Sequence, residues 1–126
     1  MKIIETPNAP KAIGPYSQAV QAGKFLFVSG QLGIVPETGN FAGESAEAQA
    51  DQALKNIGAI LAEAGTSFAN VADVTIFLTG IDDFNAVNAV YAGYFKTHKP
   101  ARATVEVSKL PKNAKVEIRL TALVEN

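Results

Sequence analysis

Cysteine is absent from the 126 residues, and histidine occurs only once. The missing cysteine excludes disulfides, thiolate nucleophiles and metal sites built on thiolates. One histidine, with acidic residues scattered without ligand spacing, offers no set of metal ligands, so we expect no metal site. Serine-nucleophile chemistry lacks a base, because we do not expect His98 to meet Ser29. His98 is expected to cap the end of a helix.

Long apolar runs are also missing. No window approaches the roughly 18 consecutive apolar residues that cross a bilayer, and the first stretch, MKIIETPNAPKAIGP, has no apolar region of the kind that directs export. We therefore expect a cytoplasmic protein with no membrane partner. The glycines form neither a phosphate-binding loop nor a dinucleotide-binding fingerprint.

The net charge is small as well. A formal charge of −1 gives the whole molecule no attraction to nucleic acid, which argues against nucleic acid as a partner. The charges are unevenly distributed, however. Between Lys96 and Arg119 there are seven Lys and Arg residues and two Glu residues. We expect this part of the chain to attract small anions.

The apolar residues that are present repeat with the periods of strands and helices. With no break in composition, the chain is expected to form a single domain spanning 1–126. Alternation of apolar and polar residues predicts strands, and a 3.6-residue period predicts helices. The expected strands lie at 2–4, in a hairpin over 17–31, and at 71–80, 103–108 and 114–124, and the expected helices lie at 45–67 and 82–98.

This order of elements predicts an α+β fold in which one mixed β-sheet carries two helices on one face, in the order β-β-β-α-β-α-β-β. The first helix is expected to start at a Ser45 cap and to stop at Gly65. The second helix is expected to open on Asp82 as its cap and to continue through Phe95. The apolar residues that should bury one side of the first helix are Leu54, Ile57, Ile60 and Leu61.

The sheet face that the helices leave uncovered combines large apolar side chains with charges. If the apolar rows of the strands lie under the helices, alternation places the remaining residues on the far face. Three phenylalanines of about 150–250 Å² each would form a large exposed patch. We therefore expect a homo-oligomer in which the far faces meet and the embedded charges line a cleft between protomers. The far-face residues expected are Phe25, Phe27, Phe77, Arg102, Glu106, Glu117 and Leu123.

Two of these charges, Arg102 and Glu117, are candidates for binding and catalysis. The planar guanidinium of Arg102 suits a carboxylate, which it can bind through two parallel hydrogen bonds. A carboxylate such as Glu117 can orient or activate a water. Each also has a plainer interpretation, with Arg102 paired to a glutamate and Glu117 paired or solvated. Tyr16 and Ser29 are hydrogen-bonding groups beside tight turns, and ordinary turn chemistry would also account for them.

Longer motifs connect these residues. The stretch PARATVEVSKLPKNAKVEI, preceded by YFKTHK, resembles the signature of the RidA (YjgF-like) family of reactive intermediate deaminases, and so do AIGPYSQAV and LFVSGQLG. The similarity runs from about Ile3 to Val124. The resemblance implies a chorismate-mutase-like α+β fold and a homotrimer with active clefts between neighbouring subunits.

The resemblance also implies an activity, the hydrolysis of reactive 2-imino acids and their enamines, such as 2-iminobutanoate and 2-iminopropanoate, to 2-oxo acids and ammonia. By position, Arg102 would hold the substrate carboxylate, Glu117 would orient or activate the attacking water, and Tyr16 would complete the catalytic set. No cofactor is required, because such imines also hydrolyse spontaneously. The residues expected to bind substrate are Ser29, Gly30, Arg102 and Thr104.

Other functions remain open at this point. A regulatory or chaperone-like module that binds small carboxylates without turnover would use the same cleft. A ribonuclease has less support, because the chain has no histidine pair and no basic surface rich in aromatics. The chain also departs from many relatives by carrying Ala103 and Thr104 where those have serine and cysteine. This leaves the preferred imino acid open.

Overall fold

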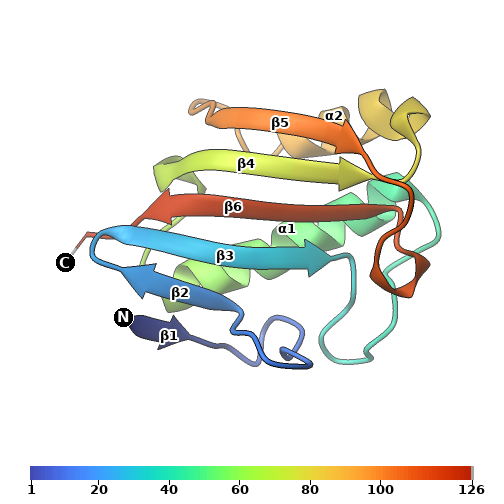
Figure 1. Ribbon diagram of the computed structural model, residues 1–126. Helices are drawn as coiled ribbons and strands as arrows, with labels where there is room; N and C mark the ends of the chain where they lie inside the picture. Colours follow the sequence, from blue (N-terminus) through green and yellow to red (C-terminus); the bar gives the residue numbers. More distant parts are fainter. Residues whose placement is uncertain (126) are drawn as a thin grey trace.

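The chain forms a six-stranded mixed sheet with two helices on one face (Figure 1). The computed structural model describes residues 1–125. The elements are β1 Lys2–Ile4, β2 Ala19–Ala22, β3 Phe25–Leu32, α1 Ala46–Glu63, β4 Val71–Leu78, α2 Phe84–Ala92, β5 Ala101–Glu106 and β6 Val116–Leu123. The strands are ordered β1-β2-β3-β6-β4-β5, and all neighbours are antiparallel except β4 and β5. The predicted α+β class and element order are confirmed.

Helix α1 forms where the sequence predicts it. The Ser45 hydroxyl accepts a hydrogen bond from the Ala48 N–H at 3.1 Å, which caps the first turn. Gly65 has a φ of 81°, a left-handed conformation that glycine adopts without strain, and it ends the helix. The four apolar residues predicted to be buried are at most 1% exposed. Neither helix within residues 1–125 combines the length and the apolar character needed to cross a membrane.

Helix α2 starts differently from the prediction. A short 3-10 turn, Ile81–Asp83, precedes it, and the N-cap position is Asp83, whose side chain makes no capping bond. The predicted cap at Asp82 is therefore wrong. The backbone N–H of Ile81 donates instead to Glu106 Oε1 on β5, at 2.8 Å. A carboxylate from a distant strand thus satisfies a donor at the start of this segment.

Helix α2 also ends earlier than predicted, at Ala92. The next aromatic residues nevertheless pack inward. Phe95 stacks on Tyr91 with 4.6 Å between ring centroids, and the Tyr94 hydroxyl donates to Asp51 Oδ1 on α1 at 2.7 Å. The apolar stripe therefore identified residues that pack against the core, although the last two, Tyr94 and Phe95, lie beyond the end of the helix.

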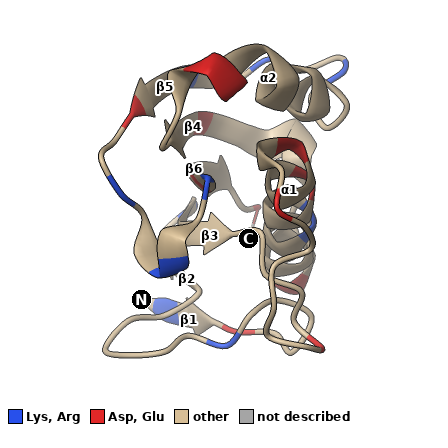
Figure 2. Cartoon of the chain, turned by 90° about the vertical axis from the view of Figure 1, so that its right-hand side faces the viewer, with Lys and Arg blue, Asp and Glu red and all other residues tan. Residues whose placement is uncertain are grey.

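Only one face of the sheet is covered within the described chain. Figure 2 shows both α-helices on the same side of the strands, with no α-helix on the opposite side. We call this uncovered side the open face. Its exposed apolar residues are 41–62% accessible to solvent, which confirms the expected exposure of two phenylalanines and Leu123. They are Ile3, Phe25, Phe27, Val105 and Leu123.

The prediction that Arg102 shares the open face with Glu117 is wrong. The parallel register pairs Arg102 with Val74, a core residue under the helices, and the Arg102 side chain contacts α2. Val105 points the other way and is exposed. Strand β5 lies at the edge of the sheet, where α2 offers aromatic rings and polar groups to a charged side chain. The polarity of the β5 side chains therefore does not determine which row of them lies on the helix side of the sheet. The β5 residues on the helix side are Arg102, Thr104 and Glu106.

Candidate active site

One group of predicted site residues gathers on the open face, where β3 is irregular. The register between β3 and β6 shifts between Val28 and Gln31, which places a bulge at Ser29 and Gly30. The Glu117 side chain of β6 extends over this bulge. A Cβ atom added at Gly30 would lie 2.6 Å from Glu117 Oε2, closer than real contacts allow. Glycine at this position therefore leaves the room that the carboxylate occupies.

Ser29 connects the bulge to the loop that carries Tyr16. Its hydroxyl donates to the Ser17 carbonyl at 2.6 Å. The Tyr16 hydroxyl accepts the N–H of Ile13 at 3.3 Å. Ser29 thus uses its hydrogen within the chain and keeps lone pairs free, whereas Tyr16 keeps its hydrogen free to donate. We call Tyr16, Ser29, Gly30 and Glu117 the glutamate cluster.

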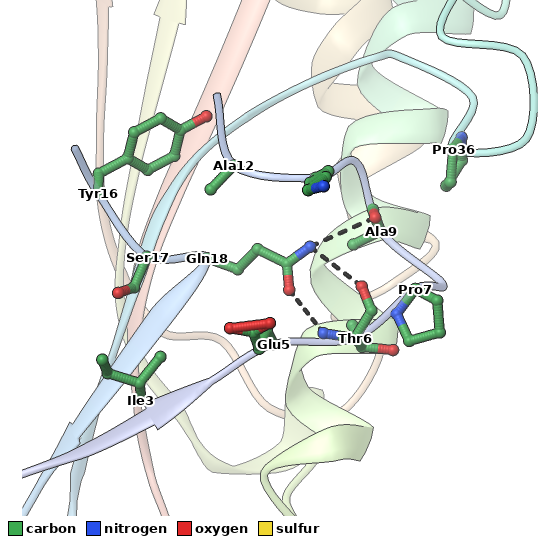
Figure 3. A pocket seen from close by; sticks show the side chains of 11 residues that line it. Ile3, Glu5, Thr6, Pro7, Ala9, Ala12, Tyr16, Ser17, Gln18 and Pro36 are labelled. Atoms are coloured by element: carbon green, nitrogen blue, oxygen red, sulfur yellow. Dashed lines mark hydrogen bonds between the residues drawn. The ribbon is translucent and has the colours of Figure 1, made fainter. Parts of the chain in front are cut away.

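The loop before Tyr16 is fixed by the buried amide of Gln18. Its Oε1 accepts the N–H of Thr6 at 2.7 Å, and its Nε2 donates to the carbonyls of Thr6, Ala9 and Pro10 at 3.1, 3.3 and 2.8 Å. Figure 3 shows this amide between the two arms of the loop, beside a cavity of about 640 Å³ that Tyr16 also lines. The amide supplies the backbone partners that a strand would otherwise provide, and so it fixes residues 6–10 of the loop that leads to Tyr16.

The environment of Glu117 makes it a stronger base than an exposed glutamate. Burial raises the pKa of the Glu117 carboxyl above its usual value. The single ion pair among residues 1–125 is Lys55 with Asp51, so no cation of the same chain is paired with Glu117. A carboxylate with a raised pKa accepts a proton from water more readily than one in bulk solvent.

Arg102 lies on the helix side of the sheet edge and is held by α2. Its Nη1 donates to Asn88 Oδ1 at 2.7 Å. Its Cζ lies 4.8 Å from the centre of the Tyr91 ring and 5.7 Å from that of Phe84. The three α2 residues follow one another at intervals of four and three, which places them on one side of the helix. These contacts fix the cation without neutralising it.

Two hydroxyl groups near Arg102 have no hydrogen-bond partner among the described residues, Tyr91 Oη and Thr104 Oγ1. Burial raises the pKa of Tyr91, and the charge of Arg102 partly opposes this. A cavity of about 450 Å³ opens beside Tyr91 and Arg102, and Asn88 and Lys99 also line it. We call Asn88, Tyr91, Arg102 and Thr104 the arginine cluster.

Within one chain the two clusters are separate. Glu117 is on the open face of β6, Arg102 is on the helix side of β5, and β4 lies between these strands. Two strand spacings amount to about 10 Å even before the opposite faces are considered. The structure thus places Gly30 against Glu117, with Ser29 beside it in the bulge and bonded to the loop that carries Tyr16. It places Thr104 on the same strand face as Arg102. It does not bring Arg102 to Glu117 in the same chain.

Sequence reasoning missed Asn88 and the two rings that hold Arg102. A signal for Asn88 was present, because it is a polar residue at helical spacing between Phe84 and Tyr91 in an otherwise apolar stripe. The sequence did not show on which face of the sheet the Arg102 side chain lies. Only the register of β5 against β4 turns that side chain toward the helix.

His98 lies outside both clusters. Its Nε2 and the Val71 carbonyl oxygen are 2.5 Å apart, which ties the segment after α2 to the start of β4. The predicted helix cap is therefore wrong, because α2 ends at Ala92, well before His98. In the described part of the chain, no three His, Asp or Glu side chains gather as metal ligands would.

Comparison with known proteins gives matches over almost the whole chain. Residues 6–124 match the family model described as Endoribonuclease L-PSP. Human 2-iminobutanoate/2-iminopropanoate deaminase is 46% identical over 122 residues, covering 97% of this chain and 89% of that protein. Reactive Intermediate Deaminase A, chloroplastic, from Arabidopsis thaliana is 48% identical over 121 residues, covering 96% of this chain and 65% of that longer protein.

A solved structure matches the fold as well. The crystal structure of E. coli TdcF with bound serine aligns with a TM-score of 0.94 at 41% identity, covering 99% of this chain and 100% of that one. This agreement supports the chorismate-mutase-like fold that the motifs implied. The family model and these relatives cover almost the whole chain, and the chain belongs to the RidA (YjgF-like) family.

Proposed function

We propose that the protein hydrolyses reactive 2-imino acids, such as 2-iminobutanoate and 2-iminopropanoate, to 2-oxo acids and ammonia. The names of the human and Arabidopsis relatives support this reaction class. The observation that carries the proposal is the state of Arg102. Its guanidinium is fixed beside a cavity by an amide and two rings and has no carboxylate partner among residues 1–125. Such a group suits the carboxylate of a small acid.

The proposed site lies between two protomers. One copy presents the glutamate cluster on its open face and the arginine cluster on the other side, so neither is complete alone. A second copy packed against the open face would bring its arginine cluster to Glu117 of the first. The exposed apolar side chains of the open face would drive this packing. We propose a cyclic homotrimer with three such clefts.

The residue types fit a simple hydrolysis. Arg102 of one protomer binds the substrate carboxylate through two parallel hydrogen bonds and fixes the imine carbon. Glu117 of the next protomer takes a proton from a water, whose oxygen forms a bond to that carbon while the C=N electron pair moves to nitrogen. The nitrogen takes up two protons, one returned by Glu117 and one lost by the new hydroxyl. The C–N bond then breaks, ammonia leaves and the 2-oxo group forms. One water is consumed, and no cofactor is needed.

The neighbouring hydroxyls have complementary roles in this proposal. Tyr16 has a free O–H and donates to the oxygen or nitrogen that develops charge, whereas Ser29 accepts from the N–H or from the water. Gly30 keeps Glu117 close to the backbone at this point. Thr104, whose hydroxyl is buried without a partner, contacts the substrate from the arginine side.

A trapping assay tests the reaction. A threonine dehydratase releases the imine, and semicarbazide captures what has not yet hydrolysed, so added deaminase lowers the rate of semicarbazone formation. Arg102→Ala should remove this effect, with a loss of at least about 100-fold. Lys96→Ala, which removes an exposed positive charge from the same basic region, should leave it intact. Unchanged trapping in the presence of the wild-type protein would contradict the proposal.

A sensor of small carboxylates that performs no turnover is the second candidate. The bound serine of E. coli TdcF favours it, because serine is a small carboxylate bound by a protein with this fold. Titration calorimetry with 2-oxobutanoate separates the two functions when combined with the trapping assay. Saturable binding that Arg102→Ala abolishes, with no effect on trapping, would identify a sensor.

A further inference from the structure

We propose that Asn88 is a positioning residue whose neutral amide keeps the charge of Arg102 available to a substrate carboxylate. The inference rests on the proposed function and deepens it, because it names what sets the affinity of the site for anionic substrates. It concerns the chemical identity of the residue at position 88 rather than its shape.

The contact between the two side chains is direct. Asn88 Oδ1 accepts from Arg102 Nη1 at 2.7 Å, a short bond in which the acceptor is a neutral carbonyl oxygen. A guanidinium carries five N–H donors, so one bond to Asn88 leaves an edge free for a bidentate carboxylate. The rings of Phe84 and Tyr91 restrict the remaining motion of the group. Arg102 is thus oriented before any ligand arrives.

The charge around Arg102 is unbalanced. Among the described residues the one ion pair is between Lys55 and Asp51 on α1, and it does not include Arg102. The side chains that contact Arg102 are an amide and two aromatic rings, and a second cation, Lys99, lines the same cavity. The carboxylate of Glu106 on the same strand face is used by the Ile81 N–H. The cavity therefore presents net positive charge to a ligand.

Aspartate at position 88 would change this balance while preserving the shape. Asp and Asn have nearly the same size, and residue 88 is exposed on α2, so the fold should accommodate either. A carboxylate at 88 would form a stronger, charge-assisted bond to Nη1 and would neutralise the guanidinium. A substrate carboxylate would then meet a paired cation and a like charge beside it. Binding would weaken, although Arg102 would be held more firmly than before.

Asn85 provides a matched control on the same helix. It is exposed and lies one turn before Asn88, and Asn85→Asp makes the same isosteric change and adds the same charge. If an added negative charge anywhere on α2 weakened binding through its long-range field, both variants would show it. If direct pairing with Arg102 is the cause, only Asn88→Asp will.

The experiment is a calorimetric titration of the oligomeric protein with 2-oxobutanoate, followed by kinetics with the imine. We expect Asn88→Asp to weaken binding by at least about tenfold, Asn88→Ala by about two- to fivefold, and Asn85→Asp by less than about twofold. In the kinetics Asn88→Asp should raise KM and leave kcat nearly unchanged, because carboxylate binding is the same in the ground state and the transition state. A role that is merely structural would lower thermal stability instead.

Each outcome decides something. Wild-type affinity in Asn88→Asp, together with lost binding in Arg102→Ala, would overturn the inference and leave the proposed function standing. No binding by the wild-type protein, or equal binding by Arg102→Ala, would overturn carboxylate capture and this inference with it. Should Asn88→Asp fail to fold, Asn88→Ala decides the positioning role: weaker binding supports it, and unchanged affinity contradicts it.

Discussion

The glutamate cluster and the arginine cluster are built by different means. Backbone geometry fixes Glu117, through a bulge in β3 and the space left by Gly30. Side chains fix Arg102, through an amide and two rings on a helix of nine residues. The first arrangement lies in the interior of the sheet, and the second lies at its edge. The two candidate groups should therefore respond to different mutations.

The difference also bears on the proposed site between protomers. The two clusters lie on opposite faces of the same sheet, so each carries a group that has no counterpart nearby. Glu117 is partly buried without a cation, and Arg102 is held without a carboxylate. Association of copies would bring together groups that folding alone keeps apart.

Gly30→Ala should have the largest effect on the glutamate cluster. The added Cβ would overlap the Glu117 carboxylate, which can move because it is the end of a flexible side chain. We expect kcat/KM to fall by at least about tenfold, while the free energy of unfolding changes by less than about 1 kcal/mol. Imine trapping and urea denaturation measure the two quantities.

Gly80→Ala is the control for this prediction. A Cβ at Gly80 would lie 3.6 Å from its nearest neighbour, an ordinary contact with Asp83 Oδ2. Activity close to that of the wild type is expected. Full activity in Gly30→Ala would show that the position of Glu117 does not matter.

The pH dependence of activity should report the burial of Glu117. Because burial raises the pKa of this carboxyl above its usual value of 4.5, its ionised form is lost at a higher pH than in an exposed glutamate. If Glu117 is the base, kcat/KM falls as pH decreases, with a midpoint above 4.5. Direct observation of imine decay, corrected for the spontaneous rate at each pH, gives the profile. A midpoint at or below 4.5 would argue against burial of the catalytic base.

Tyr94→Phe should have a smaller effect, and only on stability, near the arginine cluster. It removes the hydrogen bond from Tyr94 to Asp51, which ties the end of α2 to α1. We expect a loss of about 1 kcal/mol in the free energy of unfolding. This bond holds the pKa of Asp51 below its usual value of 3.8, so the loss should be full above pH 3.8 and shrink as the pH falls below it.

Lys55→Ala is the control for the Tyr94 bond, because it removes the other partner of the Asp51 carboxylate. Lys55 forms an exposed ion pair with the same carboxylate, at 3.2 Å. Its removal should cost less than about 0.5 kcal/mol, because solvent screens exposed pairs. An equal loss of unfolding free energy in both variants would show that the Tyr94 bond stabilises the fold no more than an exposed ion pair does.

Local patterns were sufficient for much of this structure. The cap at Ser45, the stop at Gly65 and the apolar stripe of α1 each act within a few residues, and the structure has them where predicted. Alternation also placed Phe25 and Phe27 correctly, because the strand that carries them has one fully buried face.

The edge of the sheet could not be predicted in the same way. On β5 neither row of side chains is closed off by a complete layer, so the alternation of polar and apolar residues does not identify the buried face. The orientation of Arg102 depends on the register with β4 and on partners contributed by α2, which are distant in sequence. The predicted end of α2 was wrong for a related reason. Aromatic side chains continue to pack inward after the helical backbone stops, so the sequence pattern extends beyond the helix.

Mixing two inactive variants tests the shared cleft most directly. Arg102→Ala retains the glutamate cluster, and Glu117→Ala retains the arginine cluster. If each cleft takes one cluster from each of two neighbouring protomers, some clefts in a mixed oligomer contain both intact groups. Unfolding the two variants together and refolding them in equal amounts produces such oligomers, and the variants refolded separately and then combined are the control.

The account predicts that the co-refolded mixture regains about a quarter of the wild-type activity per chain, because half of the arginine sides and half of the glutamate sides are intact and they meet at random. The separately refolded control should stay inactive. Activity that remains at the level of the single variants after co-refolding, in oligomers shown to contain both, would contradict a site built from two protomers.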